Sequence, residues 1–355
     1  MIMKTKREQL FTKLKRKCGA FLLIMAMVLS MAACGSEKSG TTEAAQGTAT
    51  TENKADDVII RIGSLKGPTS MGLVNLRKAV ESGDADAGYK GKYTFTMETQ
   101  ADVIAASIVS GNLDIALVPA NLAAVLYKKT EGKVKVLSIN TMGVLECVTG
   151  DANIKSVKDL AGKTVYSTGQ GTTPEYALRF LLEQYDVKDC TIEFKSEATE
   201  IASLLKEDAT KIAVLPQPFA TVAQAQNEAV KRAFTLYDAW SELNVDSQLV
   251  TGLTIVRSEF LEQHPAAVKT FMQDAAKSVE AAKNDTEKTA ELIAEYGIIE
   301  KAPIAKKALP ECNLVSTSGE EMQKTVSGYL KTLFDRDPKS VGGALPGEDF
   351  YYLGE

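Results

Sequence analysis

The residues best suited to contact a small molecule lie in four loops, each between a predicted strand and a predicted helix. Ligand crevices in open α/β sheets lie beyond the carboxyl ends of strands, where free N–H groups at helix starts favour anions and polar oxygens. We expect the chain to form two lobes and the four loops, two from each lobe, to converge on one cleft between them. The candidate contacts are Lys66, Thr69, Ser70, Met71, Asn121, Gln170, Thr172, Thr173, Gln217 and Phe219.

These residue types suit the binding of a ligand rather than its conversion. Lys66 offers a charge, whereas the amides and hydroxyls of Asn121, Gln170 and Thr172 can orient a ligand without charge. Thr172 and Glu175 also fit a capping box, and caps and glycines are needed at any strand-to-helix turn. A structural role is therefore the alternative for each loop. Trp240, the only tryptophan, is either a stacking wall of the site or a residue of the core or hinge.

The counts of histidine and cysteine exclude most catalytic and metal chemistry. His264 is the only histidine, and no nucleophile-elbow glycine pattern accompanies it. Cys147, Cys190 and Cys312 have no CxxC spacing, so neither a zinc nor a redox motif is present. A disulfide between Cys190 and Cys312 stays open. We predict no catalytic residue, no bound metal and no cofactor.

The first 57 residues are typical of an export signal followed by a tether. Residues 1–17 are basic, residues 20–28 are apolar, and small residues precede Cys34. This order predicts a signal peptide over residues 1–33 and resembles a bacterial lipobox, in which Cys34 would carry the lipid. An ordinary signal peptide with a chance cysteine is the alternative. Residues 35–57 have no large apolar side chain, so we expect residues 34–57 to be a flexible tether.

Charge and length describe the remaining body. Of 41 Lys+Arg and 46 Asp+Glu, seven and one lie in residues 1–33, which leaves 34 and 45 and a net charge of −11. So acidic a chain lacks the basic surface that broad nucleic-acid binding needs. The remaining 322 residues favour two domains.

Strand and helix patterns alternate from residue 57 onward, which indicates mostly parallel sheets covered by helices. The predicted strands are 57–63, 93–97, 113–118, 134–140, 143–149, 164–167, 191–194, 212–215 and 249–256. The predicted helices lie near 71–80, 101–110, 121–129, 176–182, 199–205 and 220–230, with more from residue 260 onward.

Four motifs in this order resemble those of ABC-importer solute-binding proteins. They lie at residues 63–73, 110–116, 157–165 and 258–268, and the resemblance spans about residues 58–335. The similar branch includes nitrate, sulfonate, taurine and thiamine-precursor binders. The resemblance implies a type II periplasmic-binding-protein fold, with two lobes of mixed, mostly parallel sheets joined by two crossing strands.

On this interpretation, residues 58–149 form the first part of lobe 1, residues 150–248 form lobe 2, and residues 249–355 return to lobe 1. The chain would pass between lobes at Thr141–Met142 and Thr251–Gly252, the candidate hinge. A small organic solute, such as a sulfonate or a pyrimidine-like compound, would bind between the lobes and be delivered to a membrane permease. We expect a monomer outside the cytoplasm, held to the cell membrane by lipid.

Two other functions stay open. The fold also resembles that of some cofactor-pathway enzymes, namely pyrimidine synthases and menaquinone-route lyases. A sensory receptor without a permease is the third interpretation.

Overall fold

The structure, a computed structural model, describes residues 58–243 and 245–354. The described residues all belong to one compact unit. The predicted signal peptide over residues 1–33, the lipidation residue Cys34 and the tether over residues 34–57 lie outside the described residues. None of the described helices combines the length and the apolar character that crossing a membrane requires.

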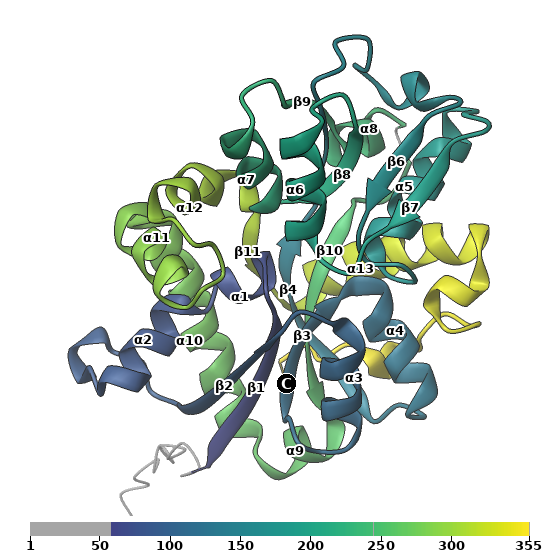
Figure 1. Ribbon diagram of the computed structural model, residues 1–355. Helices are drawn as coiled ribbons and strands as arrows, with labels where there is room; N and C mark the ends of the chain where they lie inside the picture. Colours follow the sequence, from purple (N-terminus) through teal and green to yellow (C-terminus); the bar gives the residue numbers. More distant parts are fainter. Residues whose placement is uncertain (1–57, 244, 355) are drawn as a thin grey trace, which may run out of the picture. The chain divides into compact units, whose positions relative to one another are not determined.

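The described strands form two sheets (Figure 1). The first sheet has the order β11-β4-β10-β3-β1-β2 and the second has the order β7-β6-β8-β5-β9. The strands are β1 (Ile59–Leu65), β2 (Lys92–Glu98), β3 (Ile115–Pro119), β4 (Val134–Met142), β5 (Leu145–Thr149), β6 (Thr164–Ser167), β7 (Thr191–Phe194), β8 (Ile212–Pro216), β9 (Lys231–Thr235), β10 (Val250–Arg257) and β11 (Leu314–Thr317).

Helices connect the strands and cover both sheets. The α-helices are α1 (Pro68–Met71), α2 (Val74–Ser82), α3 (Ala101–Val109), α4 (Ala120–Lys129), α5 (Thr173–Gln184), α6 (Ala198–Glu207), α7 (Phe219–Gln226), α8 (Leu236–Glu242), α9 (Ser258–Gln263), α10 (Pro265–Asn284), α11 (Thr286–Glu295), α12 (Ala302–Ala308) and α13 (Gly319–Arg336). The 3₁₀ helices are η1 (Ala85–Ala87), η2 (Val157–Leu160), η3 (Leu309–Cys312), η4 (Pro338–Val341) and η5 (Glu348–Phe350).

Both sheets are mixed, as expected, but parallel pairing does not dominate. Four strand pairs among the described residues are parallel and five are antiparallel. The antiparallel pairs all involve β5 or β10, apart from the pair between β11 and β4. The reason is that β5 and β10 begin after the chain has crossed from one sheet to the other, and each enters its new sheet against the direction of its neighbours.

The crossing points correct the predicted boundary between the lobes. Residues 143–149 were expected to end the first lobe, yet β5 pairs with β8 and β9 in the second sheet. The first crossing therefore lies at residues 143–144, between β4 and β5, and the return crossing lies between α8 and β10. The buried side chains of Leu145, Cys147 and Val148 fit the position of this strand inside its sheet, between β8 and β9.

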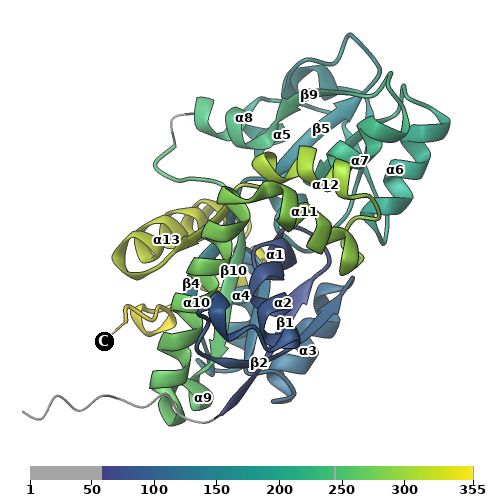
Figure 2. The same ribbon diagram turned by 90° about the vertical axis from the view of Figure 1, so that its left-hand side faces the viewer.

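The C-terminal helices contact elements of both sheets. Helix α10 packs against α2, while α12 packs against α7 (Figures 1 and 2). Helix α13 contacts β4 and β10 of the first sheet and α5 beside the second. The segment after residue 249 thus joins the two halves rather than covering the first alone.

The three cysteines within the described part of the chain are unpaired. Cys147, Cys190 and Cys312 are all free, so the open question of a disulfide between Cys190 and Cys312 is answered in the negative here. The sulfur of Cys312 lies 3.2 Å from the carbonyl oxygen of Ala308 and 3.7 Å from the sulfur of Met71 in a closed apolar core. Burial raises the pKa of the Cys312 thiol well above its ordinary value, which makes the residue unreactive.

Candidate functional site

A cleft of about 850 Å³ lies between loops of the two sheets. Each sheet contributes three loops that follow a parallel strand and precede a helix. The first sheet contributes residues 65–69, 99–102 and 119, and the second contributes residues 168–174, 194–199 and 216–219, apart from a few residues that point elsewhere. Leu145 and Thr251, beside the two crossings, also line the cleft. Residues of α3 and α4 extend the lining, namely Ala105, Ala106, Val109, Leu122, Val125, Leu126 and Lys129.

Strand direction explains why these loops meet. Strands β1, β2 and β3 are mutually parallel, so their carboxyl ends lie at one edge of the first sheet. Strands β6, β7 and β8 have the same relation in the second sheet. The two edges face one another across the cleft, which is the place where α/β sheets hold ligands.

Six of the predicted contact residues line this cleft. They are Lys66, Thr69, Gln170, Thr172, Thr173 and Phe219. The hydroxyl of Thr69 donates to the carbonyl oxygen of Leu65 at 3.0 Å, and that of Thr172 donates to Gly169 at 2.7 Å. Both hydroxyls keep lone pairs with which they could accept a hydrogen bond from a ligand.

Two predicted contacts in the first loop point away from the cleft. The hydroxyl of Ser70 donates to the carbonyl oxygen of Leu65 at 2.5 Å, beside the hydroxyl of Ser64. Met71 is completely buried in an apolar core cluster. The cause is that α1 begins at Pro68, and its single turn directs Ser70 and Met71 into the protein.

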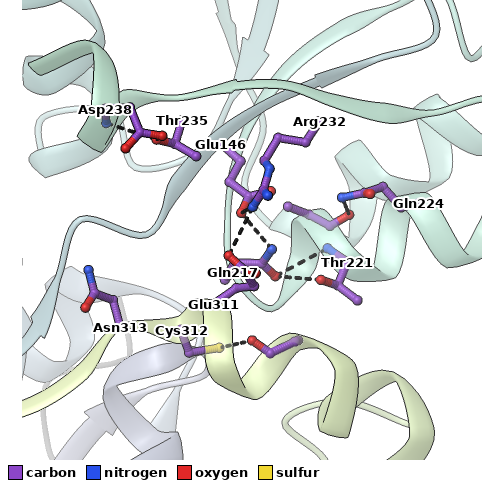
Figure 3. Close-up of polar contacts among 12 residues, drawn as sticks. Glu146, Gln217, Thr221, Gln224, Arg232, Thr235, Asp238, Glu311, Cys312 and Asn313 are labelled. Carbon is purple, nitrogen blue, oxygen red and sulfur yellow. Dashed lines mark hydrogen bonds and ion pairs between the residues drawn. The ribbon is translucent and has the colours of Figure 1, made fainter. Parts of the chain in front are cut away.

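Asn121, Gln217 and Trp240 are also buried outside the cleft lining. The amide of Asn121 donates to the carbonyl oxygens of Gly171 and Ser340 at 3.2 and 3.1 Å. Gln217 donates to the carboxylate of Glu146 at 3.0 Å (Figure 3).

The side chain of Trp240 packs 4.2 Å from the ring of Phe180, measured between ring centres, and donates to the carbonyl oxygen of Ser247 at 3.2 Å. Its position is that of a core residue, which corrects the hypothesis of a stacking wall.

The predicted capping box at α5 takes another form. Thr172 precedes the helix but caps it with no side-chain hydrogen bond, because its hydroxyl bonds Gly169 instead. Glu175 accepts the backbone N–H of Gly171 at 2.7 Å and pairs with Arg179. The carboxylate thereby orders the loop that carries Gln170.

Sequence reasoning missed two of the six loops, at residues 99–102 and 194–199. They follow β2 and β7, and both strands were predicted. The rule that selected the other four loops, a strand end followed by a helix start, applies equally to these two. Applied throughout, it would have found the cleft residues Gln100, Asp102, Lys195, Ser196 and Glu197.

The cleft combines unoccupied helix starts with a small number of charges. The residues before α3, α4, α5, α6 and α7 make no side-chain capping bonds. First-turn N–H groups are already bonded in α3, where Val103 donates to Asp102, and in α7, where Thr221 donates to Gln217, so those of α4 and α5 are the better candidates for a ligand. Lys66 is half-buried and has no ion-pair partner within residues 58–243 and 245–354. Lys195, by contrast, lies 3.9 Å from the carboxylate of Glu200. Asp102 and Glu197 are the acidic groups of the lining.

Polar contacts already cross the cleft. The amide of Gln100, before α3, donates to the carbonyl oxygen of Ser196 at 3.4 Å. The hydroxyl of Thr173 donates to the amide oxygen of Asn121 at 3.4 Å, from α5 to α4. These bonds join loops of different sheets, so any change in the angle between the sheets must break or remake them.

The four candidate hinge residues lie together inside β4 and β10 of the first sheet, so the chain crosses between the sheets next to them rather than at them. Met142 pairs with Val250, and Thr141 pairs with Gly252, at a place where the register of β4 and β10 is irregular. A Cβ atom at Gly252 would collide with the side chain of Asn140, which explains the glycine. The hydroxyl of Thr251 is buried without a hydrogen-bond partner among the described residues, and Thr251 lines the cleft. A buried hydroxyl without a partner costs free energy, and it lies beside the crossings rather than exposed in the cleft.

The chain is similar in sequence to a known protein family and to individual binding proteins. Residues 110–289 match the family model described as NMT1/THI5 like. A putative binding protein of Brucella abortus strain 2308 is 21% identical over 291 residues, which cover 79% of this chain and 85% of that protein.

Solved structures show the same fold. An ABC transporter structure from Parabacteroides distasonis matches with a TM-score of 0.69 and 21% identity, covering 83% of this chain and 98% of the other. The periplasmic aliphatic sulphonate binding protein SsuA from Escherichia coli matches with a TM-score of 0.63 and 15% identity, covering 83% and 92%. These likenesses confirm the predicted type II periplasmic-binding-protein fold.

Proposed function

The chain belongs to the NMT1/THI5-like family, and on that premise we propose that it is the solute-binding component of an ABC importer. The observation that carries this proposal is the cleft of about 850 Å³ bounded by three strand-to-helix loops from each sheet. A cleft built in two halves can take up a ligand when open and enclose it when closed.

The lining supports a small organic solute with a polar head and an apolar portion. Lys66 and the free N–H groups of the helix starts suit sulfonate, carboxylate or carbonyl oxygens. Gln170 and Thr172 supply neutral hydrogen-bonding groups. The side chains of Phe194 and Phe219 offer apolar surface for the rest of the ligand. Sulfonates and pyrimidine-like compounds both fit this description.

Ligand binding shifts the equilibrium between open and closed forms. The ligand stabilises the closed form only by the extra contacts that it makes there, with both sets of loops at once. The two crossings, at residues 143–144 and between α8 and β10, act as the hinge together with the adjoining strand residues 141–142 and 251–252. A membrane permease then recognises the closed form and receives the solute.

The N-terminal sequence supports a position outside the cytoplasm. The basic segment, the apolar core and the small residues before Cys34 direct export and lipid attachment. A lipid at Cys34, followed by the polar tether, keeps a monomeric receptor at the membrane surface within reach of its permease.

The first experiment weighs what the purified protein carries. Native mass spectrometry detects a co-purified compound, and a thermal-shift panel tests taurine, butanesulfonate, nitrate, cytosine and simple carboxylates. A ligand at 100 times its Kd should stabilise the fold by about 2.7 kcal/mol. The proposal fails if nothing co-purifies and no compound of these classes raises Tm.

Variants then place the ligand. Lys66→Gln should weaken binding of an anionic ligand about tenfold, because it removes a charge-assisted hydrogen bond. Gln170→Ala should also weaken binding. Lys307→Gln, which changes an exposed lysine on α12, is the matched control and should leave affinity unchanged. Equal affinities in all three variants would contradict binding in this cleft.

Two further measurements address the other functions. Conversion of the bound compound by the purified protein would identify an enzyme of the same fold. Uptake of the compound by cells should be lost when the protein is deleted, whereas uptake that persists would favour a sensory receptor.

A further inference from the structure

A second pocket lies on the other side of the crossing strand from the cleft. This hinge pocket has a volume of about 470 Å³ and is lined by segments 143–146, 232–235 and 237–238, together with Pro310, Glu311 and Asn313. Leu145 lines both the cleft and the hinge pocket, so the crossing segment separates them. A rotation of one sheet relative to the other about this segment should narrow the cleft while it widens the hinge pocket, or the reverse.

The hinge pocket contains a buried carboxylate that is only half satisfied. Glu146, on β5, is 3% exposed. Its Oε1 accepts hydrogen bonds from Gln217 and from Arg232, each at 3.0 Å (Figure 3). Its Oε2 is buried without a hydrogen-bond partner among the described residues. Leaving a buried charged oxygen without a partner is costly, so the arrangement needs a compensating contact.

Arg232 is divided between two carboxylates. The same terminal nitrogen lies 3.0 Å from Glu146 and 3.0 Å from Glu311. Hydrogen bonding to Glu146 is the largest of the causes that raise the pKa of Arg232. Glu311 belongs to η3, which leads into β11 of the first sheet, whereas Arg232 lies on β9 and Glu146 on β5 of the second sheet. The Arg232–Glu311 ion pair therefore crosses from one sheet to the other (Figure 3).

We propose that Arg232 has two pairing states and that its bond to Glu311 opposes closure of the cleft. Closing the cleft moves Glu311 away from Arg232, because the pair lies on the far side of the crossing segment. Once it is released from Glu311, the guanidinium can donate two parallel N–H hydrogen bonds to the carboxylate of Glu146. The second bond would satisfy Oε2, since arginine commonly pairs with carboxylates in this two-bond geometry. Arg232 is thus a positioning residue that sets ligand affinity through the hinge, an inference that rests on the proposed function.

The same network reaches the cleft. Gln217 accepts a hydrogen bond from the hydroxyl of Thr221 at 2.9 Å while it donates to Glu146. Two residues further along the chain, Phe219 lines the cleft. A change in the hydrogen-bond partners of Glu146 should therefore alter the position of Gln217 and, with it, the loop that carries Phe219.

The test removes one carboxylate charge and measures the distance between the two halves without any ligand. Spin labels introduced as a noncanonical amino acid at Val103, on α3, and at Lys206, on α6, avoid the native cysteines. Glu311→Gln changes a half-exposed side chain, so the variant should fold with an unchanged Tm. Glu287→Gln is the matched control, because its ion pair with Lys306 joins α11 to α12 and does not cross the hinge.

We expect Glu311→Gln to raise the ratio of closed to open molecules by roughly two- to fivefold, which is the range of a partly exposed ion pair. The distance distribution should shift toward shorter values, high salt should produce the same shift in the unmodified protein, and Glu287→Gln should leave it unchanged. A distribution in Glu311→Gln that matches the control, or one that shifts to longer values, overturns the proposal.

The outcome is separable from that of the proposed function. If the ligand panel finds no ligand, the proposed function fails, while the label distances still report on the ion pair. If a panel compound binds, its affinity in Glu311→Gln should rise by the same roughly two- to fivefold. If both the affinity and the label distances are unchanged in Glu311→Gln, the proposed role of Arg232 is overturned while the proposed function still holds.

Discussion

The carboxylate of Asp114 ties three strands of the first sheet together at the start of β3, whose other end reaches the cleft. Its oxygens accept hydrogen bonds from the guanidinium of Arg61, on β1, at 2.6 and 2.8 Å, and from Arg257, on β10, at 3.0 Å. Burial alone would raise the pKa of Asp114, but these hydrogen bonds outweigh burial and hold its pKa below the ordinary value. The charged form is therefore the one that the fold stabilises.

Asp114→Asn should lower the free energy of unfolding by about 2–3 kcal/mol at pH 7, because two arginines lose their shared carboxylate. Since the folded pKa is depressed, this contribution is present above the unfolded pKa and is lost as pH falls through the folded value. Urea unfolding at pH 7 and at about pH 3 should therefore show the difference shrinking in acid.

Asp335→Asn is the control for that measurement, because Asp335 forms an exposed pair with Lys331 on α13. It should change the stability by less than about 0.5 kcal/mol. A cost for Asp114→Asn that stays constant across this pH range would show that the carboxylate acts by its shape rather than by its charge.

Residue by residue, the sequence identified the loops more reliably than the direction of their side chains. Thr69 and Ser70 are neighbours with similar chemistry, yet only Thr69 lines the cleft. The difference follows from the single helical turn that begins at Pro68, and residue type alone does not predict it. The buried pairing of Gln217 with Glu146, 71 residues apart in sequence, depends likewise on strand pairing.

Among the elements, an aromatic contact joins three helices behind the cleft. Trp240, on α8, lies 4.2 Å from Phe180, on α5, and 5.7 Å from Tyr329, on α13, measured between ring centres. Helix α13 thus contacts the helices beside the second sheet while it also packs on β4 and β10. This contact stabilises the fold from outside the ligand site.

Trp240→Phe should reduce the stability by about 1–2 kcal/mol, because it removes buried ring surface and the hydrogen bond to Ser247, and it should leave ligand affinity unchanged. Phe194→Ala changes a residue of the cleft lining, so it should weaken binding of a panel compound and have a smaller effect on stability than Trp240→Phe. Urea unfolding and calorimetric titration separate the two effects. A large loss of affinity in Trp240→Phe would restore Trp240 to the ligand site.

The sequence predicted most strands and helices up to residue 257, including the edge strands β2 and β7, but it predicted neither the pairing directions nor the edge strands β9 and β11. Residues 231–235, which form β9, are exposed or half-buried, so they lack the apolar run that marked the central strands. Likewise, residues 143–149 were predicted as a strand, but nothing local shows that they belong to the second sheet. That assignment depends on where the chain crosses, which is a property of the tertiary fold.

For the molecule as a whole, the two halves are distinct in their sheets but continuous in their cores. One apolar cluster contains Leu253 of the first sheet together with Val214 of the second. Another contains Met71 of α1 together with Phe219 and Leu292. Motion between the halves must therefore slide packed surfaces near the crossings, while the loops at the cleft move furthest.

The claim that the ligand lies between the two halves is tested most directly by hydrogen–deuterium exchange with and without the compound that the panel identifies. The account predicts slower exchange, by about tenfold or more, in loops of both sheets, namely residues 65–69 and 99–102 on one side and residues 168–173 and 194–199 on the other. Protection confined to the loops of one sheet, or absent from all four, would contradict it.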